Sequence, residues 1–374
     1  MHGQEIITFV TVFAALSLTM LTQAATDQER LEILERRLDA LTSSSQETEM
    51  MKQVQLGGYG ELHYNNLSGT GGASDKKELD FHRFVLFAGY DFNERVRFNS
   101  ELELEHALAG DGKTGEVELE QAYVDFDVTE DHTARAGLFL VPVGLINPTH
   151  EPPRFYGTER NPVEKNIIPT TWWEGGFGLH GQLGAGWQYE AALHSGLNTS
   201  TGSTYAVRSG RQKVAEANAS DPAGTLAISW NIPGVSVGGA LQYQSDITQG
   251  NDATAGSAWL GELHAVVQRG PFGLRALYAE WDLDGHGPES MGADRQYGWY
   301  VEPSYRITDS VGVFARYSEW DNAAGSGDSG KAQIDTGVNW WPHEQVVFKA
   351  DYQWQDSENG KEHNGGNLGV GYEF

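Results

Sequence analysis

The sequence contains no cysteine. This absence excludes disulfide bonds, thiolate metal sites, thiol nucleophiles and lipid attachment through sulfur. Basic residues are also scarce: 25 Lys and Arg stand against 52 Asp and Glu, and the formal net charge of −27 argues against nucleic acid as a partner. Long apolar runs are absent after residue 24, and the mean hydropathy is −0.46. These values resemble those of a soluble protein, but they also suit a transmembrane barrel, whose apolar residues alternate with polar ones.

Residues 1–24 carry the one apolar stretch, IITFVTVFAALSLTML, followed by small residues around Ala24. This arrangement predicts a secretory signal peptide. The stretch has about 16 residues where a membrane span needs about 20, so a membrane anchor is less favoured. The start, MHGQE, departs from the usual signal because it lacks Lys and Arg. We interpret the chain as exported.

Residues 25–53 predict a short α-helix in the periplasm. Leu31, Leu34, Leu38 and Leu41 follow the 3-4-3 spacing of a coiled-coil seam. Two heptads are too short to be stable alone, so we expect an oligomer held together elsewhere to support the helix. The alternative is a solvated linker.

From Val54 to the C-terminus, apolar and polar residues alternate in sixteen segments, which is the pattern of β-strands with unlike faces. The segments are 54–66, 78–92, 95–107, 116–128, 132–141, 175–184, 186–196, 223–232, 234–246, 256–269, 271–282, 294–307, 309–321, 331–342, 344–357 and 365–374. Tight connections such as NE, PG and TD alternate with long polar ones such as NAAGSGDSG. The sequence therefore predicts an all-β fold, a sixteen-stranded antiparallel transmembrane β-barrel over 54–374.

The chain stops inside its last strand, at Phe374. A terminal strand is normally an exposed edge that invites aggregation. An even number of strands returns the last one to the side where the first began, so we expect the last strand to close the barrel. Within 344–357, Phe348 and Trp354 oppose Lys349 and Asp351, as lipid and lumen faces require. A soluble β-sandwich is less favoured, because sandwiches rarely contain sixteen strands in one meander.

Sixteen strands enclose a water-filled lumen, so inward charges face an aqueous path. The inferred inward acids are Glu61, Asp91, Glu101, Glu103, Glu105, Asp125, Asp127, Glu190, Glu262, Glu302, Asp335 and Asp351. The inferred inward bases are Arg83, Arg97, Arg135, Arg275, Arg306, Arg316 and Lys349. Any single one of these is explained by ordinary wetting of the lumen. The collective excess of acids predicts a mild preference for cations.

The connection at 145–176 differs from the other long ones, because it contains five prolines and few glycines. Long, stiff segments of this kind are usually functional. We expect it to fold into the lumen as a constriction loop, anchored by Trp172 and Trp173, with selectivity set by Arg154, Glu159, Arg160, Glu164 and Lys165. The alternatives are an exterior cap and a contact between protomers.

No catalytic or metal-binding pattern stands out. His82 is assigned to the lipid face without a nearby partner, and no spacing of His, Asp or Glu matches a known ligand set. We therefore expect no enzymatic activity, no cofactor and no metal.

The stretches LGGYGELHYN, ELDFHRFVLFAGYDFNERVRFNSELELEHALAGDGKTGEVELEQAYVDF and AGLFLVPVGLINPTHEPPRFYGTERNPVEKNIIPTTWWEGG resemble bacterial outer-membrane porins of the phosphate-selective O/P type. The resemblance implies sixteen-stranded homotrimers with a loop folded into each pore. It also implies that the barrel-assembly machinery reads the terminal Phe374, and that the N-terminal helix is a periplasmic coiled coil. Phosphate selectivity in this family depends on a ladder of Arg and Lys. Arg83, Arg97 and Arg135 lie in the matching region, but acids dominate the inferred wall here.

The sequence thus favours an outer-membrane porin for passive diffusion of small hydrophilic solutes and ions, surrounded by lipid. Two alternatives are a phosphate or anion channel and a structural tether that joins the outer membrane to the cell wall through 27–52. A barrel enzyme is the least favoured.

Overall fold

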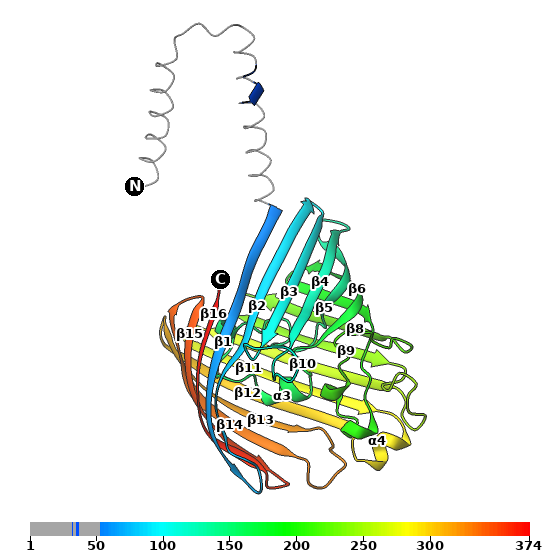
Figure 1. The fold of residues 1–374 in the computed structure, drawn as a ribbon, viewed down its shortest axis with the longest axis vertical. Helices are drawn as coiled ribbons and strands as arrows, with labels where there is room; N and C mark the ends of the chain where they lie inside the picture. Colours follow the sequence, from blue (N-terminus) through cyan, green and yellow to red (C-terminus); the bar gives the residue numbers. More distant parts are fainter. Residues whose placement is uncertain (1–31, 33–34, 37–52) are drawn as a thin grey trace. The chain divides into compact units, whose positions relative to one another are not determined.

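Sixteen antiparallel strands form one closed barrel in the computed structural model, and each strand pairs with its neighbours in the chain (Figure 1). The structure describes residues 32, 35, 36 and 53–374. The strands are β1 (Val54–Thr70), β2 (Lys76–Asn93), β3 (Val96–Glu105), β4 (Val117–Asp127), β5 (His132–Leu140), β6 (Trp173–Gly184), β7 (Trp187–His194), β8 (Ala223–Ile232), β9 (Val235–Gln244), β10 (Ala258–Arg269), β11 (Phe272–Leu283), β12 (Arg295–Thr308), β13 (Val311–Asp321), β14 (Lys331–His343), β15 (Val346–Ser357) and β16 (Glu362–Glu373). The predicted barrel is confirmed.

The predicted signal peptide and the leucine seam of the coiled coil lie outside the described residues, and so does most of the proposed tether. Among the described residues, no helix has the length and apolar character needed to cross a membrane. The region Val54–Phe374 forms one compact unit.

The last strand closes the barrel against the first, as the even strand count predicted. In the β1–β16 pair, Leu62 lies opposite Val370. At the end of the ladder, the backbone N–H of Gly58 donates to the carbonyl of Phe374 at 3.0 Å, and the N–H of Phe374 donates to the carbonyl of Gly58 at 2.9 Å. The C-terminal strand therefore has no unpaired edge.

Short turns connect the strands at one end of the barrel, and their local sequences explain them. In the β2–β3 turn, the Asn93 side chain accepts hydrogen bonds from the N–H groups of Arg95 and Val96, at 2.9 and 3.1 Å. This is the local bonding for which asparagine is favoured in turns. Gly234 and Gly270 occupy two other turns with φ values of 77° and 57°, a region that suits glycine.

The two faces of the wall differ as the alternation predicted. On β15, Phe348 and Trp354 are 45% and 48% exposed on the outer face, whereas Lys349 on the inner face is 5% exposed. Large apolar side chains are exposed on every strand except β5. Lipid is the environment that covers such a band.

Six strand pairs show register shifts, and two of these, in the β1–β2 and β3–β4 pairs, lie away from the short turns. In the β1–β2 pair, the register shifts between the Glu61–Arg83 pair and the His63–Asp80 pair, so β2 carries one extra residue. In the β3–β4 pair, a second shift leaves Glu120 as the extra residue on β4. Bulges re-aim side chains, and patterns of period two do not reveal them.

The long connections carry the short helices, η1 (Pro152–Arg154), α3 (Pro162–Asn166), η2 (Thr201–Ser203), η3 (Val207–Gly210) and α4 (His286–Ser290). Figure 1 shows α3 within the ring of strands. The β5–β6 connection is residues 141–172, which we call the folded loop. It is four residues displaced from the predicted 145–176, because β6 already begins at Trp173 and Glu174 pairs with Phe139 of β5.

Candidate functional site: the lumen and the folded loop

The folded loop packs against the inner wall of the barrel through apolar side chains. Trp172 and Trp281 are fully buried with ring centroids 6.1 Å apart, and the indole N–H of Trp281 donates to the carbonyl of Ile167 at 2.9 Å. The buried cluster around them joins the loop to strands β9–β13; it contains Val141, Val143, Val163, Ile168, Leu260, Leu277, Ala279 and Tyr300. Packing against the inner wall therefore removes the apolar side chains of the loop from the water of the lumen.

Polar contacts fix the middle of the loop to the adjoining strands β13–β15 of the wall. The carbonyl groups of Pro153, Phe155 and Tyr156 accept hydrogen bonds from side chains of β13 and β14. The N–H of Thr158 donates to Asp351 of β15 at 2.6 Å. On the other side, His150 lies 3.2 Å from Glu101 of β3. Because its backbone groups are satisfied by distant strands, the loop lies across the lumen.

The predicted loop charges occupy different environments. Glu164 has no exposed surface: its carboxylate accepts from the N–H groups of Leu145 and Ile146 and from the hydroxyl of Tyr300. The expectation that Glu164 lines the channel is therefore corrected, because its hydrogen bonds turn it into the interior of the loop. Arg154 instead pairs with Glu373, 2.9 Å away on β16.

Glu159, Arg160 and Lys165 lie at a water-accessible space. Glu159 accepts from Asn65 at 3.1 Å and lies 3.3 Å from His63. Burial opposes its ionisation, but the hydrogen bond and electrostatic attraction from His63 outweigh burial and hold the pKa of Glu159 well below its usual range. One guanidinium nitrogen of Arg160 donates to the hydroxyl of Thr171 at 2.6 Å.

This space, the loop-side chamber, lies at the end of the barrel with the long connections and has a volume of about 600 Å³. Its charged lining consists of Lys76, Glu159, Arg160, Lys165, Lys331, Lys361 and His363. Lys76 pairs with Glu78 at 3.0 Å. Within the described part of the chain, no ion pair involves Arg160, Lys165, Lys331 or Lys361. Unpaired bases thus dominate this chamber.

A second space, the turn-side chamber, has a volume of about 420 Å³. The folded loop lines it with Pro142, Leu145 and Thr149, and the wall contributes Glu190 and His264. Since the folded loop lines both chambers, it lies between the two ends of the lumen. That the loop acts as a constriction stays a prediction, and the position of the loop between the two chambers supports it.

Most predicted wall charges are paired and withdrawn from water. Arg83 lies 2.8 Å from Glu61 and 3.5 Å from Glu103, and all three are at least 94% buried. Arg316 is equally buried between Glu302 and Asp335. Several other predicted wall residues contact a partner as follows: Arg97 with Asp127, Arg135 with Asp125, Glu101 with His150, Lys349 with the ring of Phe155, and Asp351 with Thr158.

Several polar residues at the site escaped the sequence analysis. Glu120 was missed because it is the extra residue of a bulge, and it is buried near His150. Arg208 and Arg211, from the β7–β8 connection, donate to carbonyl groups of the folded loop. The basic segment VRSGRQK in a connection otherwise rich in small residues was the signal for them.

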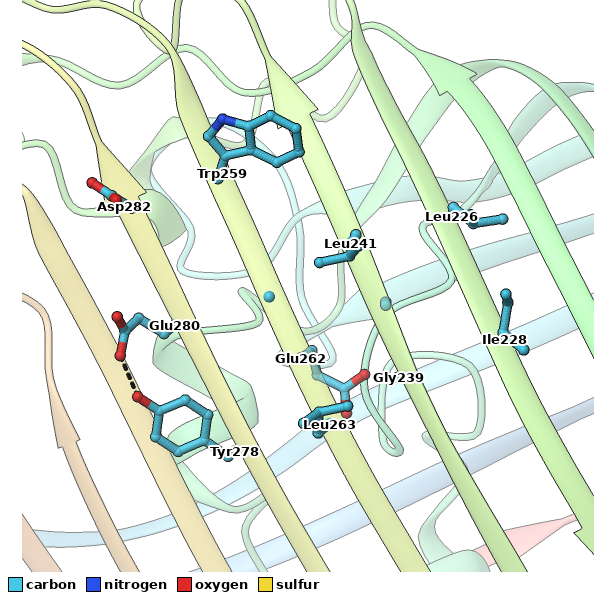
Figure 2. Close-up of a pocket in the computed structure, with 12 residues that line it drawn as sticks. Leu226, Ile228, Gly239, Leu241, Trp259, Glu262, Leu263, Tyr278, Glu280 and Asp282 are labelled. Carbon is cyan, nitrogen blue, oxygen red and sulfur yellow. Dashed lines mark hydrogen bonds between the residues drawn. The ribbon is translucent and has the colours of Figure 1, made fainter.

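A further hollow of about 700 Å³ lies on the outer wall, between strands β8 and β11 (Figure 2). Exposed apolar side chains line it, including Leu241, Trp259 and Leu263, and Gly239 and Gly261 leave it open. These side chains belong to the lipid face, so this hollow is not part of the aqueous path.

Comparison with known proteins agrees with this architecture. Residues 54–368 match the family described as phosphate-selective porin O and P. An uncharacterized protein of Aquifex aeolicus (strain VF5) is 31% identical over 361 residues, which cover 86% of this chain and 80% of that protein.

Three solved structures share the fold at low sequence identity. The anion-selective porin from Comamonas acidovorans has a TM-score of 0.60 at 12% identity, with 86% of this chain and 99% of that chain covered. The outer membrane channel DcaP of Acinetobacter baumannii has a TM-score of 0.59 at 14% sequence identity, with 86% of this chain and 97% of that chain covered. The trimer form of Vibrio cholerae OmpT has a TM-score of 0.55 at 10% sequence identity, with 86% of this chain and 99% of that chain covered.

Proposed function

The chain belongs to the family of phosphate-selective porins O and P, and from this premise we propose that it is a diffusion channel that favours small anions at its loop side. As a porin with a closed barrel, it is an outer-membrane channel protein. Its solutes are small and hydrophilic, and it performs no chemistry on them. The observation that carries the anion preference is the set of unpaired bases in the loop-side chamber.

The bases in this chamber surround a space large enough for a hydrated anion. Arg160 and Lys165 come from the folded loop, whereas Lys331 and Lys361 come from β14 and from the β15–β16 connection. Glu159 is the one carboxylate among the residues that line the chamber, and it already contacts His63 and Asn65. Positive charges without partners attract anions, and low-dielectric walls focus their field.

Burial of the acids favours this anion preference over the mild cation preference predicted from the count of inward charges. That count gave every inward charge equal weight. Glu61, Glu101, Glu103, Glu302 and Asp335 are each less than 5% exposed, and an ion in the lumen does not meet them directly. Most of these carboxylates also lie within 4 Å of a base, which cancels much of their field.

The reversal potential across a KCl gradient in planar lipid bilayers tests this proposal. We expect the sign of an anion-selective channel, with a preference that weakens as salt rises above the physiological range, where the Debye length is about 8 Å. Phosphate added at the loop side should reduce chloride current. A cation-selective sign, or chloride current indifferent to phosphate, would refute the anion preference while leaving the diffusion channel intact.

Paired variants locate the effect. Changing Arg160 and Lys165 together to glutamine should shift the reversal potential toward zero. Lys113 is a matched control, because it lies exposed in the β3–β4 connection and does not line the chamber. Changing Lys113 to glutamine should leave selectivity unchanged. Equal shifts in both variants would mean that general surface charge, and not the chamber, sets the preference.

We further propose that the protein is a homotrimer, and that the barrel-assembly machinery recognises Phe374. The likeness in fold to a Vibrio cholerae outer membrane protein described in a trimer form supports the first point. Light scattering of the detergent-solubilised protein measures the oligomer. Removing residues 27–52 should leave trimers that dissociate at lower temperature, because the coiled coil is expected to add to contacts between barrel walls.

A further inference from the structure

The β1–β2 bulge directs a histidine into the lumen. Glu61 pairs with Arg83, but His63 pairs with Asp80, so three residues of β2 span the distance that two residues of β1 cover. As a result, the ring of His82 stacks on the ring of His63 with centroids 4.7 Å apart, and His63 is 4% exposed on the inner face. The assignment of His82 to the lipid face without a partner was therefore wrong.

Two imidazoles converge on the carboxylate of Asp80. The Nδ1 atoms of His82 and His106 each lie 2.9 Å from Asp80 Oδ2. His106 is the first residue after β3, and its φ of 53° turns the chain there. Its backbone N–H donates to the carbonyl of His82 at 3.2 Å, which fixes the two histidines relative to one another.

We propose that Asp80, His82 and His106 bind a divalent transition-metal ion of the zinc class. Two imidazole nitrogens and one carboxylate oxygen form a ligand set that zinc commonly takes, with water in the fourth position. The three ligand atoms lie within 4.8 Å of one another. Ligand atoms about 2 Å from a tetrahedral zinc are about 3.3 Å apart, so the observed 2.9 Å contacts need to open only slightly.

The exposure of the three side chains suits a site that an ion can reach. Asp80, His82 and His106 are 20%, 25% and 34% exposed, so the ligands are neither buried nor free to swing in solvent. In the described residues, the Nε2 atoms of His82 and His106 have no hydrogen-bond partner in the protein. When zinc binds the Nδ1 atom of a histidine, the proton of the neutral imidazole lies on Nε2. The Nε2–H group can then donate a hydrogen bond to water.

A neighbouring group, made of His63, His82 and Glu159, is less suited to hold the ion. Its ligand atoms also lie within 4.8 Å of one another. Both ring nitrogens of His63 are already engaged, however: Nε2 lies 3.1 Å from Glu61 and Nδ1 lies 3.3 Å from Glu159. A metal ion there would have to break one of two buried contacts. The Asp80 group also has to open its two Nδ1–Oδ2 contacts, but these are partly exposed, whereas His63 is buried.

An ion at the Asp80 site would tie the start of the β3–β4 connection to the wall of the channel. It would also add positive charge close to Glu159, which lines the loop-side chamber. The site depends only on the three ligands, so it is independent of the anion preference proposed above.

Isothermal titration calorimetry with zinc chloride tests the site on the full-length protein, purified in detergent without a histidine tag. We expect the wild-type protein to bind a single zinc ion per chain. His106→Ala should weaken zinc binding by at least about tenfold, because it removes a direct ligand that only the Asp80 group contains. His63→Ala is the comparison variant: it removes a histidine that only the neighbouring group contains, together with the ring that stacks on His82, so zinc affinity should fall by less than in His106→Ala.

Absence of zinc binding by the wild type would overturn the proposal. Loss of binding in His63→Ala with retention in His106→Ala would also overturn it, by assigning the ion to the neighbouring group. The temperature dependence of electrophoretic migration reports whether each barrel is folded. Should His106→Ala fail to fold, Asp80→Asn takes its place, because it conserves shape and removes only the charged oxygen ligand. Cobalt(II) absorption spectra of the same variants report independently on the nitrogen ligands.

Discussion

Replacing Glu164 with leucine would remove the acceptor that joins the start of the folded loop to α3. Oε2 of Glu164 accepts hydrogen bonds from the N–H groups of Leu145 and Ile146, at 2.9 and 2.5 Å, and the side chain has no exposed surface. A buried donor left without a partner costs about 1–3 kcal/mol, so losing both acceptor contacts should destabilise the loop by about 2–6 kcal/mol.

Glutamine at the same position is the matched control. Its carbonyl oxygen can still accept from Leu145 and Ile146, and its amide can donate to the hydroxyl of Tyr300. The Asn161 side chain, which donates to Oε1 at 3.1 Å, loses its acceptor, and the Tyr300 hydroxyl exchanges a donated hydrogen bond for an accepted one. That loss costs about 1 kcal/mol, the net value of one hydrogen bond.

The charge of Glu164 is not what stabilises the loop. Burial raises the pKa of Glu164, although the hydrogen bonds from Ile146 and Tyr300 act in the opposite direction. A carboxyl whose pKa is raised in the folded state favours folding when protonated, and this stability is lost as the pH rises through the folded pKa. A neutral glutamine therefore avoids the ionisation cost, and we expect Glu164→Leu to be much more damaging than Glu164→Gln.

Hydrogen exchange, followed by mass spectrometry of peptides from 141–172, measures the effect. Because each 1.4 kcal/mol is a factor of ten, the leucine variant should exchange at least about 30-fold faster in the loop. The strands keep their own ladders, so exchange in β1 and β16 should not change. Single-channel conductance should rise as the loop leaves the lumen. A leucine variant with wild-type loop exchange, or a glutamine variant that matches leucine, would refute the reasoning.

Three further outcomes are expected. Arg316→Met should lower the free energy of unfolding of the barrel, measured by urea unfolding from vesicles, by about 3–5 kcal/mol, because it leaves two buried carboxylates without a base. Arg97→Met breaks a partly exposed ion pair and should cost no more than about 1 kcal/mol. Equal losses of stability in the two variants would contradict the role of burial. Phe374→Ser should lower the yield of assembled barrel in the outer membrane. It should not lower the urea midpoint of unfolding, since both hydrogen bonds that close the barrel at Phe374 use backbone atoms. A wild-type yield of assembled barrel would contradict recognition of the aromatic ring by the assembly machinery. Because the pKa of Glu159 is lowered in the fold, its contact with His63 is present above the usual value of about 4.3 and is lost only as the pH falls through the lowered pKa. Conductance should therefore be constant from about pH 7 to about pH 5, and a Glu159-dependent change in that range would contradict the shift.

Much of the fold could be read from the sequence because strand structure is local. Successive side chains of a strand point to opposite faces whatever the rest of the chain does, so alternation located all sixteen strands and the closing role of the last one. The ends of the strands were predicted less accurately. The first strand was predicted to end at residue 66, but β1 extends to Thr70, because its pairing with β2 and β16 continues past the apolar pattern.

The charged interior was decided by the tertiary structure. One extra residue in β2 moved His82 to the inner face, and another in β4 added Glu120, because a bulge changes the face without changing the composition. Contacts between distant residues then determined which charges meet water: Arg154 pairs with Glu373, and Glu164 turns into the loop to meet Tyr300. Away from these bulges, the sequence by itself determined which side chains point inward, since that follows from local geometry. Only the tertiary structure determined which of those charges an ion in the lumen encounters, because electrostatic energy depends on distance and burial in space.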